Sequence, residues 1–221
     1  MDRETFLTRV RSAMQNPDLP VGPDESPGGL VPEIPAVGLV DRFVERLGAV
    51  DALAHRASEE SAAVRIVGEL LEQYEASKYL AWEPDYLPIA GLIDRLPGSA
   101  VEARVAAEPS ERLRHQAGYM DSLVGITGAT AGLAESGSIV LDCGPGRPRM
   151  ASLIPLAHIA LLRVGDIVPS LSHWVAGHPT AAADTANLFV ITGPSRTADI
   201  EQILNLGVHG PKHLHVVLLE E

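Results

Sequence analysis

Hydrophobic residues recur in the first half of the chain at the spacing of amphipathic helices. Phe6, Val10 and Met14 form one such stripe, and residues 37–47 form another. We expect further helices over 58–74 and 86–96 and one beginning at Pro109. Short apolar runs between these segments predict strands, over 50–55, 78–82 and 101–106.

The second half of the chain is richer in glycine and in short apolar runs. These runs predict buried strands over 122–126, 138–141, 159–164, 188–192 and 215–219. Residues 197–206 are expected to form a helix that ends at Gly207. Strands that alternate with helices are typical of an α/β fold, here Rossmann-like, with a mainly parallel sheet and helices on both faces.

The stretch over residues 17–35 is rich in proline and glycine and cannot continue a helix or occupy a central strand. We therefore expect two parts: an N-terminal helix with a Pro-rich arm over 1–35, and a single α/β domain over 36–221. The arm is interpreted as an extended connector, with contact to a partner as the alternative.

Charge and hydropathy exclude several classes of protein. The 221 residues carry 17 Lys and Arg against 29 Asp and Glu, a formal net charge of −12, which argues against nucleic-acid binding. The apolar runs are far shorter than the roughly 20 residues of a membrane helix. The N-terminus mixes charges and lacks the apolar core of a secretory signal. We expect a cytoplasmic protein without membrane insertion.

Cysteine and histidine usage limits the metal chemistry of this chain. The single cysteine, Cys143, excludes an intrachain disulfide, a cysteine-based zinc site and an iron–sulfur cluster held by this chain alone. Asp142 beside it should raise the pKa of the thiol, so Cys143 is not expected to be a nucleophile. The histidines lack metal-ligand spacing, and no metal site is predicted. Among them, His209 in a glycine-flanked loop is the best candidate to face a ligand.

One candidate site lies in the glycine-rich segment 125–138. Ligands of doubly wound sheets bind beyond the carboxyl ends of the strands, and this segment follows a predicted strand. Gly128 allows close approach of a ligand to the backbone, and the hydroxyls of Thr127 and Thr130 can donate to it. The alternative is a tight turn. Glu135, a carboxylate among small residues, is either a hydrogen-bonding cap or a catalytic nucleophile or base.

A second candidate site follows the strand over 188–192. Ser195 or Thr197 is suited to cap the expected helix, Asp199 to complement its dipole, and the amides after Gly193 to bind an anion with Arg196 as a bidentate partner. The alternative is a capped helix whose Arg196 pairs with Asp199 or Glu201. The loop over 144–149 carries two further arginines and is either an anion contact or a solvated turn.

Several of these segments, in this order, resemble the lactate-utilisation protein C family, whose domain is called the LUD domain. The resemblance covers roughly residues 120–221. It rests on Gly125-Ile126-Thr127-Gly128-Ala129, Ala134-Glu135-Ser136-Gly137-Ser138, Ser152-Leu153-Ile154-Pro155 with His158, Val168-Pro169-Ser170-Leu171, Gly193-Pro194-Ser195-Arg196-Thr197-Ala198-Asp199-Ile200-Glu201 and Leu206-Gly207-Val208-His209-Gly210-Pro211.

The resemblance implies a fold of the glucosamine-6-phosphate deaminase, ribose-5-phosphate isomerase and CoA-transferase type. It also implies a role in oxidising L-lactate to pyruvate beside two partner proteins that carry iron–sulfur clusters. With one cysteine, this chain fits the cluster-free subunit, with no cofactor bound by this chain alone. The expected ligand is a small anionic metabolite held between segments 125–138 and 193–199, with Glu135 or His209 orienting or deprotonating it.

Two alternatives remain open at this point. One is a stand-alone acyl/CoA transferase or sugar-phosphate isomerase that uses Glu135, because Glu135-Ser136-Gly137 resembles the Glu-Asn-Gly of CoA transferases apart from Ser136. The other is a non-catalytic scaffold or regulatory subunit. A symmetric homodimer is the default assembly.

Overall fold

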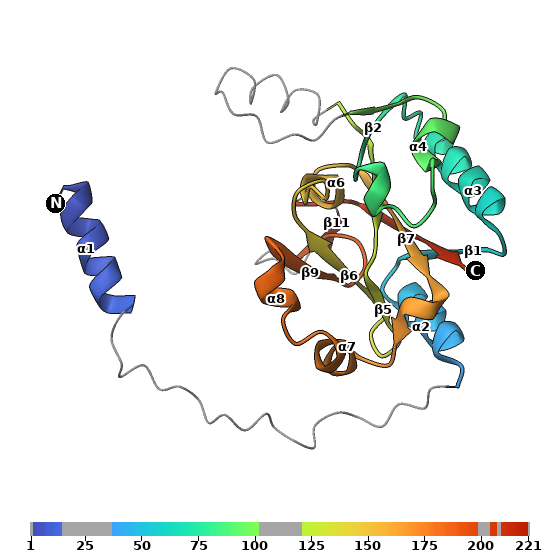
Figure 1. Cartoon of the computed structure of the whole chain (residues 1–221). Coiled ribbons are helices and arrows are strands. Elements are labelled where there is room, and N and C mark those ends of the chain that lie inside the picture. The colour runs from blue at the N-terminus through green and yellow to red at the C-terminus, as the bar shows by residue number, and fades with distance from the viewer. Residues whose placement is uncertain (1, 15–36, 102–120, 199–203, 207–208, 221) are drawn as a thin grey trace. The chain divides into compact units, whose positions relative to one another are not determined.

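The computed structural model describes residues 2–14, 37–101, 121–198, 204–206 and 209–220 (Figure 1). The chain divides into two units, Met1–Val31 and Pro32–Glu221. In the first unit, helix α1 (Arg3–Met14) confirms the N-terminal amphipathic segment. Asp2 precedes α1, and its carboxylate accepts hydrogen bonds from the backbone N–H (2.9 Å) and the hydroxyl (2.8 Å) of Thr5. The Pro-rich arm lies outside the described residues, so the boundary at residue 35 stays a prediction.

The second unit is built on a six-stranded sheet in which every pair of neighbours is parallel, as expected for an α/β fold. In spatial order the strands are β1 (Leu53–Ala57), β12 (His213–Leu219), β7 (Ala157–Arg163), β4 (Val124–Gly128), β2 (Lys78–Ala81) and β3 (Ser99–Val101). Strand β4 is buried throughout, and β7 and β12 are buried at all but one end residue, so both faces of the sheet are covered.

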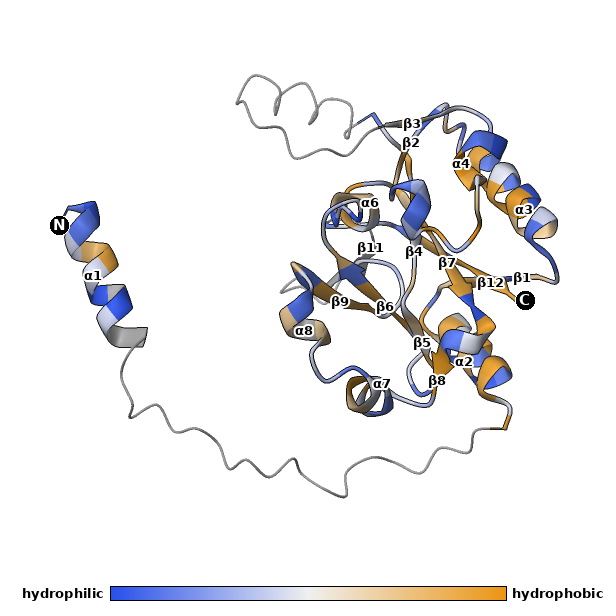
Figure 2. Cartoon of the chain, in the orientation of Figure 1, coloured by the Kyte–Doolittle hydropathy of each residue, from blue (hydrophilic) through white to orange (hydrophobic). Residues whose placement is uncertain are grey.

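Helices cover the two faces in pairs, and the strand register shows which helix lies on which face. α3 (Glu60–Gln73) and α4 (Leu92–Arg95) cover the face that carries His215 and Tyr79: the Tyr74 hydroxyl after α3 bonds to His215, and burial together with Asp94 of α4 raises the pKa of Tyr79. α2 (Leu39–Ala49) and α6 (Met150–Leu153) cover the other face. Figure 2 shows hydrophobic strands beside helices α2 and α3, which present both hydrophobic and hydrophilic residues.

A smaller four-stranded sheet packs beside the main one. Its order is β8 (Ile167–Val168), β5 (Ala131–Leu133), β6 (Ser138–Cys143) and β9 (Asn187–Ile191). Gly132 of β5 lies where the two sheets pack closely. A β-carbon there would lie 2.7 Å from the side chain of Leu162 of β7 and 3.1 Å from that of Phe43 of α2. α7 (Leu171–Gly177) contacts β8, and α8 (Ala181–Asp184) contacts β9. The short 3₁₀ turn η2 (Val164–Asp166) connects β7 to β8.

The structure differs from the sequence prediction at two expected helices, over 197–206 and over 86–96. Residues 196–206 contain an antiparallel pair of strands, β10 (Arg196–Ala198) and β11 (Leu204–Leu206), where the pattern predicted a helix. Local helix propensity is a weak preference that strand pairing overrides. The segment 86–96 holds only the 3₁₀ turn η1 (Pro84–Tyr86) and the short α4, because Pro88 interrupts a continuous helix. The helix expected from Pro109 lies outside the described residues.

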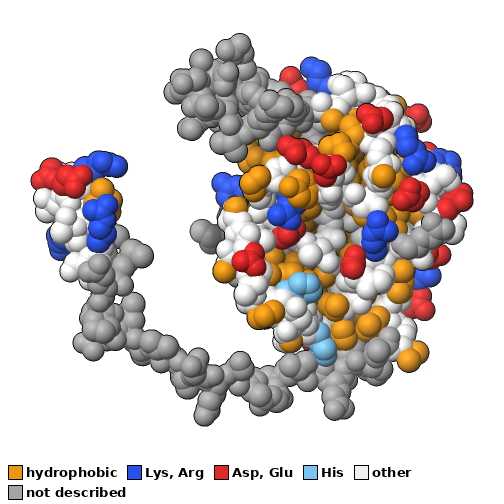
Figure 3. Space-filling view, in the orientation of Figure 1, with side chains coloured by type: hydrophobic (Ala, Val, Ile, Leu, Met, Phe, Trp, Pro, Cys, Tyr) orange, Lys and Arg blue, Asp and Glu red, His pale blue; other side chains and the backbone are white. Residues whose placement is uncertain are grey.

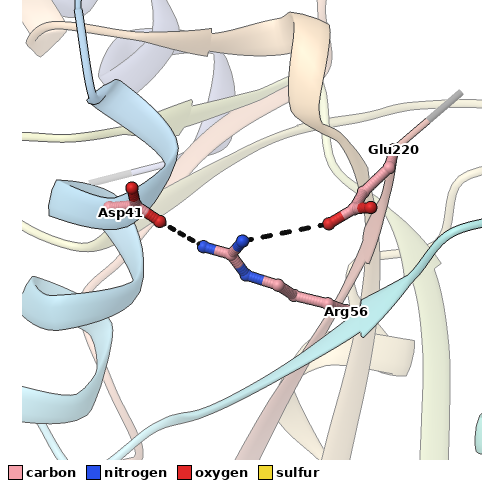
Figure 4. A network of polar contacts seen from close by, with 3 residues as sticks. All are labelled: Asp41, Arg56 and Glu220. Carbon is pink, nitrogen blue, oxygen red and sulfur yellow. Dashed lines mark hydrogen bonds and ion pairs between the residues drawn. The ribbon is translucent and has the colours of Figure 1, made fainter.

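Arg56 of β1 ties three elements together. Its guanidinium lies 2.5 Å from Asp41 of α2 and 3.9 Å from Glu220, directly after β12 (Figure 4). These side chains are largely exposed, so each ion pair contributes at most about 1 kcal/mol. Among the described helices, none has the length and hydropathy of a membrane-crossing segment.

Two histidines are buried in the main sheet and kept uncharged there. His158 of β7 bonds to the Thr127 hydroxyl (2.8 Å), and His215 of β12 bonds to His55 (2.9 Å) and to the Tyr74 hydroxyl (2.8 Å). Burial lowers the pKa of His158 to about 3 and that of His215 to about 4, with smaller contributions from neighbouring histidines. Both rings are therefore neutral at physiological pH.

These pKa values predict loss of stability in mild acid. An unfolded histidine takes up a proton below about pH 6.5 and a buried one does not, so the free energy of unfolding should fall as the pH drops from 6.5 towards 4. Each buried histidine contributes about 2 kcal/mol of this loss by pH 5. Urea unfolding at pH 7.5 and pH 5 measures it. His215→Gln, which cannot titrate, should show a shallower dependence, and an unchanged slope would contradict the assignment.

Candidate functional site

The segments 152–158, 193–195 and 209–211, far apart in sequence, meet around one cavity of about 270 Å³, here called the His158 cavity. It is open at the amino ends of β7 and β12, where His158 and Leu214 are the second residues of their strands. Its walls are mainly apolar with a few polar groups, and the lining residues are Ser152, Leu153, His158, Phe189, Val190, Ile191, Gly193, Pro194, Ser195, His209, Gly210, Pro211 and Leu214.

Close backbone packing positions the loops of this cavity. The backbone N–H of Ser195 donates to the carbonyl oxygen of Pro211 (2.8 Å), which joins the loop after β9 to the loop before β12. Gly193 adopts a φ of +74°, and a β-carbon there would clash with the carbonyl oxygen of Val50. Glycine is therefore needed at this turn, because it alone tolerates both the left-handed backbone and the close approach.

The polar side chains of the cavity are histidines and serines. His158 is uncharged, one of its ring nitrogens is occupied by Thr127, and the Ser152 hydroxyl donates to the carbonyl oxygen of Arg149 (2.9 Å). The Ser195 hydroxyl and the exposed His209 ring lie at the same cavity. Apolar walls with a few polar groups are typical of sites that bind small organic molecules.

Three of the residues predicted from sequence, Gly193, Ser195 and His209, line this cavity. Thr127 reaches it through its hydrogen bond to His158. The cavity lies at the amino end of β7 and β12, whereas the sequence interpretation placed ligands beyond carboxyl ends. The difference arises because β9, which leads into Gly193, belongs to the smaller mixed sheet, where it pairs antiparallel with β6.

Arg196 pairs with a residue that the sequence did not indicate, while Glu201, like Asp199, lies outside the described residues. The guanidinium of Arg196 lies 2.5 Å from the carboxylate of Asp51, which follows α2, and both side chains are partly or largely exposed. An exposed ion pair is weak, so an anion can compete with Asp51 for this guanidinium. Thr197 lies in strand β10, where it does not cap a helix, and Asp199 is outside the described residues.

Glu135 lies apart from the cavity, in the exposed turn between β5 and β6. Its backbone N–H donates to the carbonyl oxygen of Pro169 (2.9 Å). The next residues do meet the second candidate segment: the hydroxyls of Ser136 and Ser138 are 2.7 Å apart, and that of Ser138 is 2.8 Å from Thr192. The two segments singled out in the sequence are thus neighbours, although Glu135 itself faces solvent.

Gly128 and Thr130 line a separate hollow, here called the β2–β4 crevice, beyond the carboxyl ends of those strands. Asp142 and Arg147 line it too, paired with one another, and the Thr130 hydroxyl donates to Asp142 (3.0 Å). Burial, and secondarily Asp142, raises the pKa of Cys143 to about 11, in the predicted direction, so the thiol stays protonated. On the face drawn in Figure 3, acidic and basic side chains are interspersed.

The sequence did not single out His158 or Asp142 as site residues, whereas Arg147 lies in the loop 144–149 that was considered as an anion contact. His158 entered the sequence analysis only within the family resemblance, because its partner Thr127 is 31 residues away and only strand pairing brings the two together. The one available signal was a histidine within an otherwise apolar strand. Among the described residues, no three His, Cys, Asp or Glu side chains are grouped to hold a metal ion.

Comparison with known proteins gives consistent matches. The family model of the LUD domain matches residues 40–219. A lactate utilization protein C of Halalkalibacterium halodurans is 31% identical over 99% of this chain and 98% of its own length. Another, from a Geobacillus species, is 29% identical over 81% of this chain and 79% of its own length. A crystal structure of a DUF162 family protein from Deinococcus radiodurans shares the fold, with a TM-score of 0.60 and 21% identity over 85% of this chain and 99% of that one.

The turn at Gly193 should be intolerant of a side chain. We expect Gly193→Ala to lower the free energy of unfolding by about 1–3 kcal/mol, because alanine must adopt a positive φ against the Val50 carbonyl. Urea unfolding measures the change. Gly177→Ala is the matched control, since a β-carbon there meets nothing within 4 Å, and it should change stability by less than about 0.5 kcal/mol. Equal effects of the two substitutions would contradict the strained-turn interpretation.

Proposed function

The chain belongs to the LUD domain family, and on that premise we propose that it is a lactate-utilisation protein whose His158 cavity binds the small organic acid, L-lactate or its oxidation product pyruvate. In this proposal it is the cluster-free subunit of an oxidising system and acts with iron–sulfur partner proteins. The names of the relatives support a role in lactate utilisation, and the lining of the His158 cavity supports the binding site.

The observation that carries the proposal is the convergence of separate segments on one cavity. Residues 152–158, 193–195 and 209–211 all contribute to its lining, and the Ser195–Pro211 hydrogen bond holds two of these segments together. Each lies within one of the segments on which the family resemblance rests in the sequence. A cavity of about 270 Å³ with a few hydrogen-bonding groups suits a compact metabolite better than a large cofactor.

Ser195 and His209 are the residues that we propose to bind the carboxylate. Both side chains lie at the cavity on glycine-containing loops, and both can donate hydrogen bonds to a carboxylate oxygen. Arg196, next in the chain to Ser195, adds positive charge nearby when its exposed pair with Asp51 opens. The methyl group of the acid packs against apolar walls such as Leu153 and Leu214.

The partner proteins follow from the chemistry of lactate oxidation. Removing two electrons from a hydroxy acid requires an acceptor, and iron–sulfur clusters are held by about four cysteine thiolates. This sequence has one cysteine, and it is buried with a raised pKa. Clusters that accept the electrons would therefore be carried by other chains.

Calorimetric titration of the full chain with L-lactate and with pyruvate tests the site. We expect Ser195→Ala and His209→Ala each to weaken binding about tenfold to a hundredfold, the value of one hydrogen bond to a charged group. Ser61→Ala, at an exposed serine of α3, is the control and should leave the affinity unchanged. Binding that is absent, or that is indifferent to both cavity variants, would contradict the proposed site.

Affinity purification of the tagged chain from lactate-grown cells of its source organism tests the partners. We expect co-purification of cysteine-rich proteins with the broad visible absorption of iron–sulfur clusters. Cells grown without lactate are the control for induced association. If the chain is recovered alone at low salt and the isolated chain turns over lactate, the subunit proposal is contradicted and the protein is a self-sufficient enzyme.

A further inference from the structure

We propose that the β2–β4 crevice is a second ligand site, which takes a neutral compound with adjacent hydroxyl groups and about the size of a pentose. The proposal is independent of lactate binding, because the two hollows have different linings and lie at opposite ends of the main sheet. It rests on the topology of the sheet, on the polar groups of the crevice and on its charge.

Topology places the crevice at a point where the strand order reverses. From β2 the chain continues outward to β3 through α4, while the strand of the main sheet that follows β4 is β7, on the opposite side. The connecting helices α4 and α6 cover opposite faces of the sheet. When the chain leaves two neighbouring strands in opposite directions, a crevice remains beyond their carboxyl ends. Open α/β sheets generally bind their ligands in this crevice.

The polar groups of the crevice are held in a fixed arrangement. The Asp142 carboxylate accepts hydrogen bonds from Thr130 (3.0 Å) and from the Arg147 guanidinium, whose Cζ lies 5.0 Å from the centre of the Tyr86 ring. The Nε–H of Arg147 is buried without a hydrogen-bond partner. Gly128 keeps the floor close to the η1 turn, since a β-carbon there would lie 2.8 Å from the Tyr86 carbonyl oxygen.

This arrangement matches adjacent hydroxyl groups. Each carboxylate oxygen of Asp142 has a second lone pair that can accept a hydroxyl proton, and the guanidinium of Arg147 has further N–H groups that can donate to a hydroxyl oxygen. Two planar groups side by side can therefore contact two neighbouring hydroxyls at once. The exposed Tyr86 ring offers an apolar surface for the C–H groups of such a ligand.

Charge and backbone pairing disfavour an anion in the crevice. Its described lining holds Asp85, Asp142 and Arg147, a net charge of −1. The backbone N–H of Ala129 donates to Leu161 (2.9 Å) and that of Thr130 to Val140 (2.8 Å), so these amides are not available to cradle a phosphate. A cavity of about 270 Å³ lies at the small end of ligand sites, which suits a pentose and is too small to enclose a dinucleotide.

Trp82 lines the crevice and provides a direct signal. In a Trp174→Phe background it is the sole tryptophan of the chain, because the sequence has two. We expect D-ribose to change the Trp82 emission saturably, and 2-deoxy-D-ribose, which lacks one of two adjacent hydroxyls, to bind at least about fivefold more weakly. L-lactate and inorganic phosphate should leave the emission unchanged.

Asp142→Asn should weaken ribose binding at least about tenfold, because it removes the charged acceptor. Thr130→Val keeps the pair of Asp142 with Arg147 and should weaken binding about threefold, which guards against misfolding of the first variant. Asp166→Asn, at an exposed carboxylate of η2, is the matched control and should bind as the parent does.

The proposal is overturned if D-ribose leaves Trp82 unchanged up to about 50 mM, well above a Kd of about 1 mM. It is also overturned if folded Asp142→Asn and Thr130→Val bind ribose like the parent, or if lactate or phosphate produces the same saturable change. None of these results alters the calorimetric test of the His158 cavity.

Discussion

The insertion of β12 between β1 and β7 is the pairing on which the rest of the unit depends. Among the described strands, β12 is the only neighbour of β1 in the main sheet, so the first strand of the sheet is held by the last. The same insertion seats the loop 209–211 against Ser195 and brings His215 under Tyr74. Because β1 and β12 are some 160 residues apart, the sheet closes only after most of the chain has been made, which is typical of slow-folding topologies.

Closing the sheet in this way produces two hollows of contrasting chemistry. The His158 cavity lies at the amino ends of β7 and β12, and the residues described there carry no acidic or permanently basic side chain. The β2–β4 crevice lies at the carboxyl ends of its strands and contains two acids and an arginine. Strand β4 contributes to both hollows. Its residue Thr127 bonds to His158 of the cavity, and the next residue, Gly128, lines the crevice.

The sequence predicts the elements of this fold better than it predicts their partners. Short apolar runs located the strands of the main sheet, since burial on both faces requires continuous hydrophobic stretches. The helix expected over 197–206 was wrong, because β10 and β11 pair with each other across that segment and local propensity does not include such pairing. The strand order was not predictable, since no residue type specifies that β12 enters between β1 and β7.

The candidate site shows the same division. Ser195, Gly193 and His209 were identified because glycine-flanked loops with hydroxyl and imidazole groups have a recognisable composition. Arg196 was identified too, but its partner Asp51 comes from a loop 145 residues earlier, where no pattern signals it. His158 and Asp142 lie within apolar strands, and their importance depends on neighbours that only the folded sheet supplies.

The hydrogen bond between Thr127 and His158 can reverse its direction without any change of charge. A neutral imidazole has one protonated and one unprotonated ring nitrogen, and a threonine hydroxyl can either donate or accept. If the hydroxyl donates to Nε2, then Nδ1 carries the hydrogen, and if it accepts, Nδ1 is bare. Switching between these tautomers therefore exchanges a donor for an acceptor at Nδ1 while the Thr127 contact at Nε2 is kept.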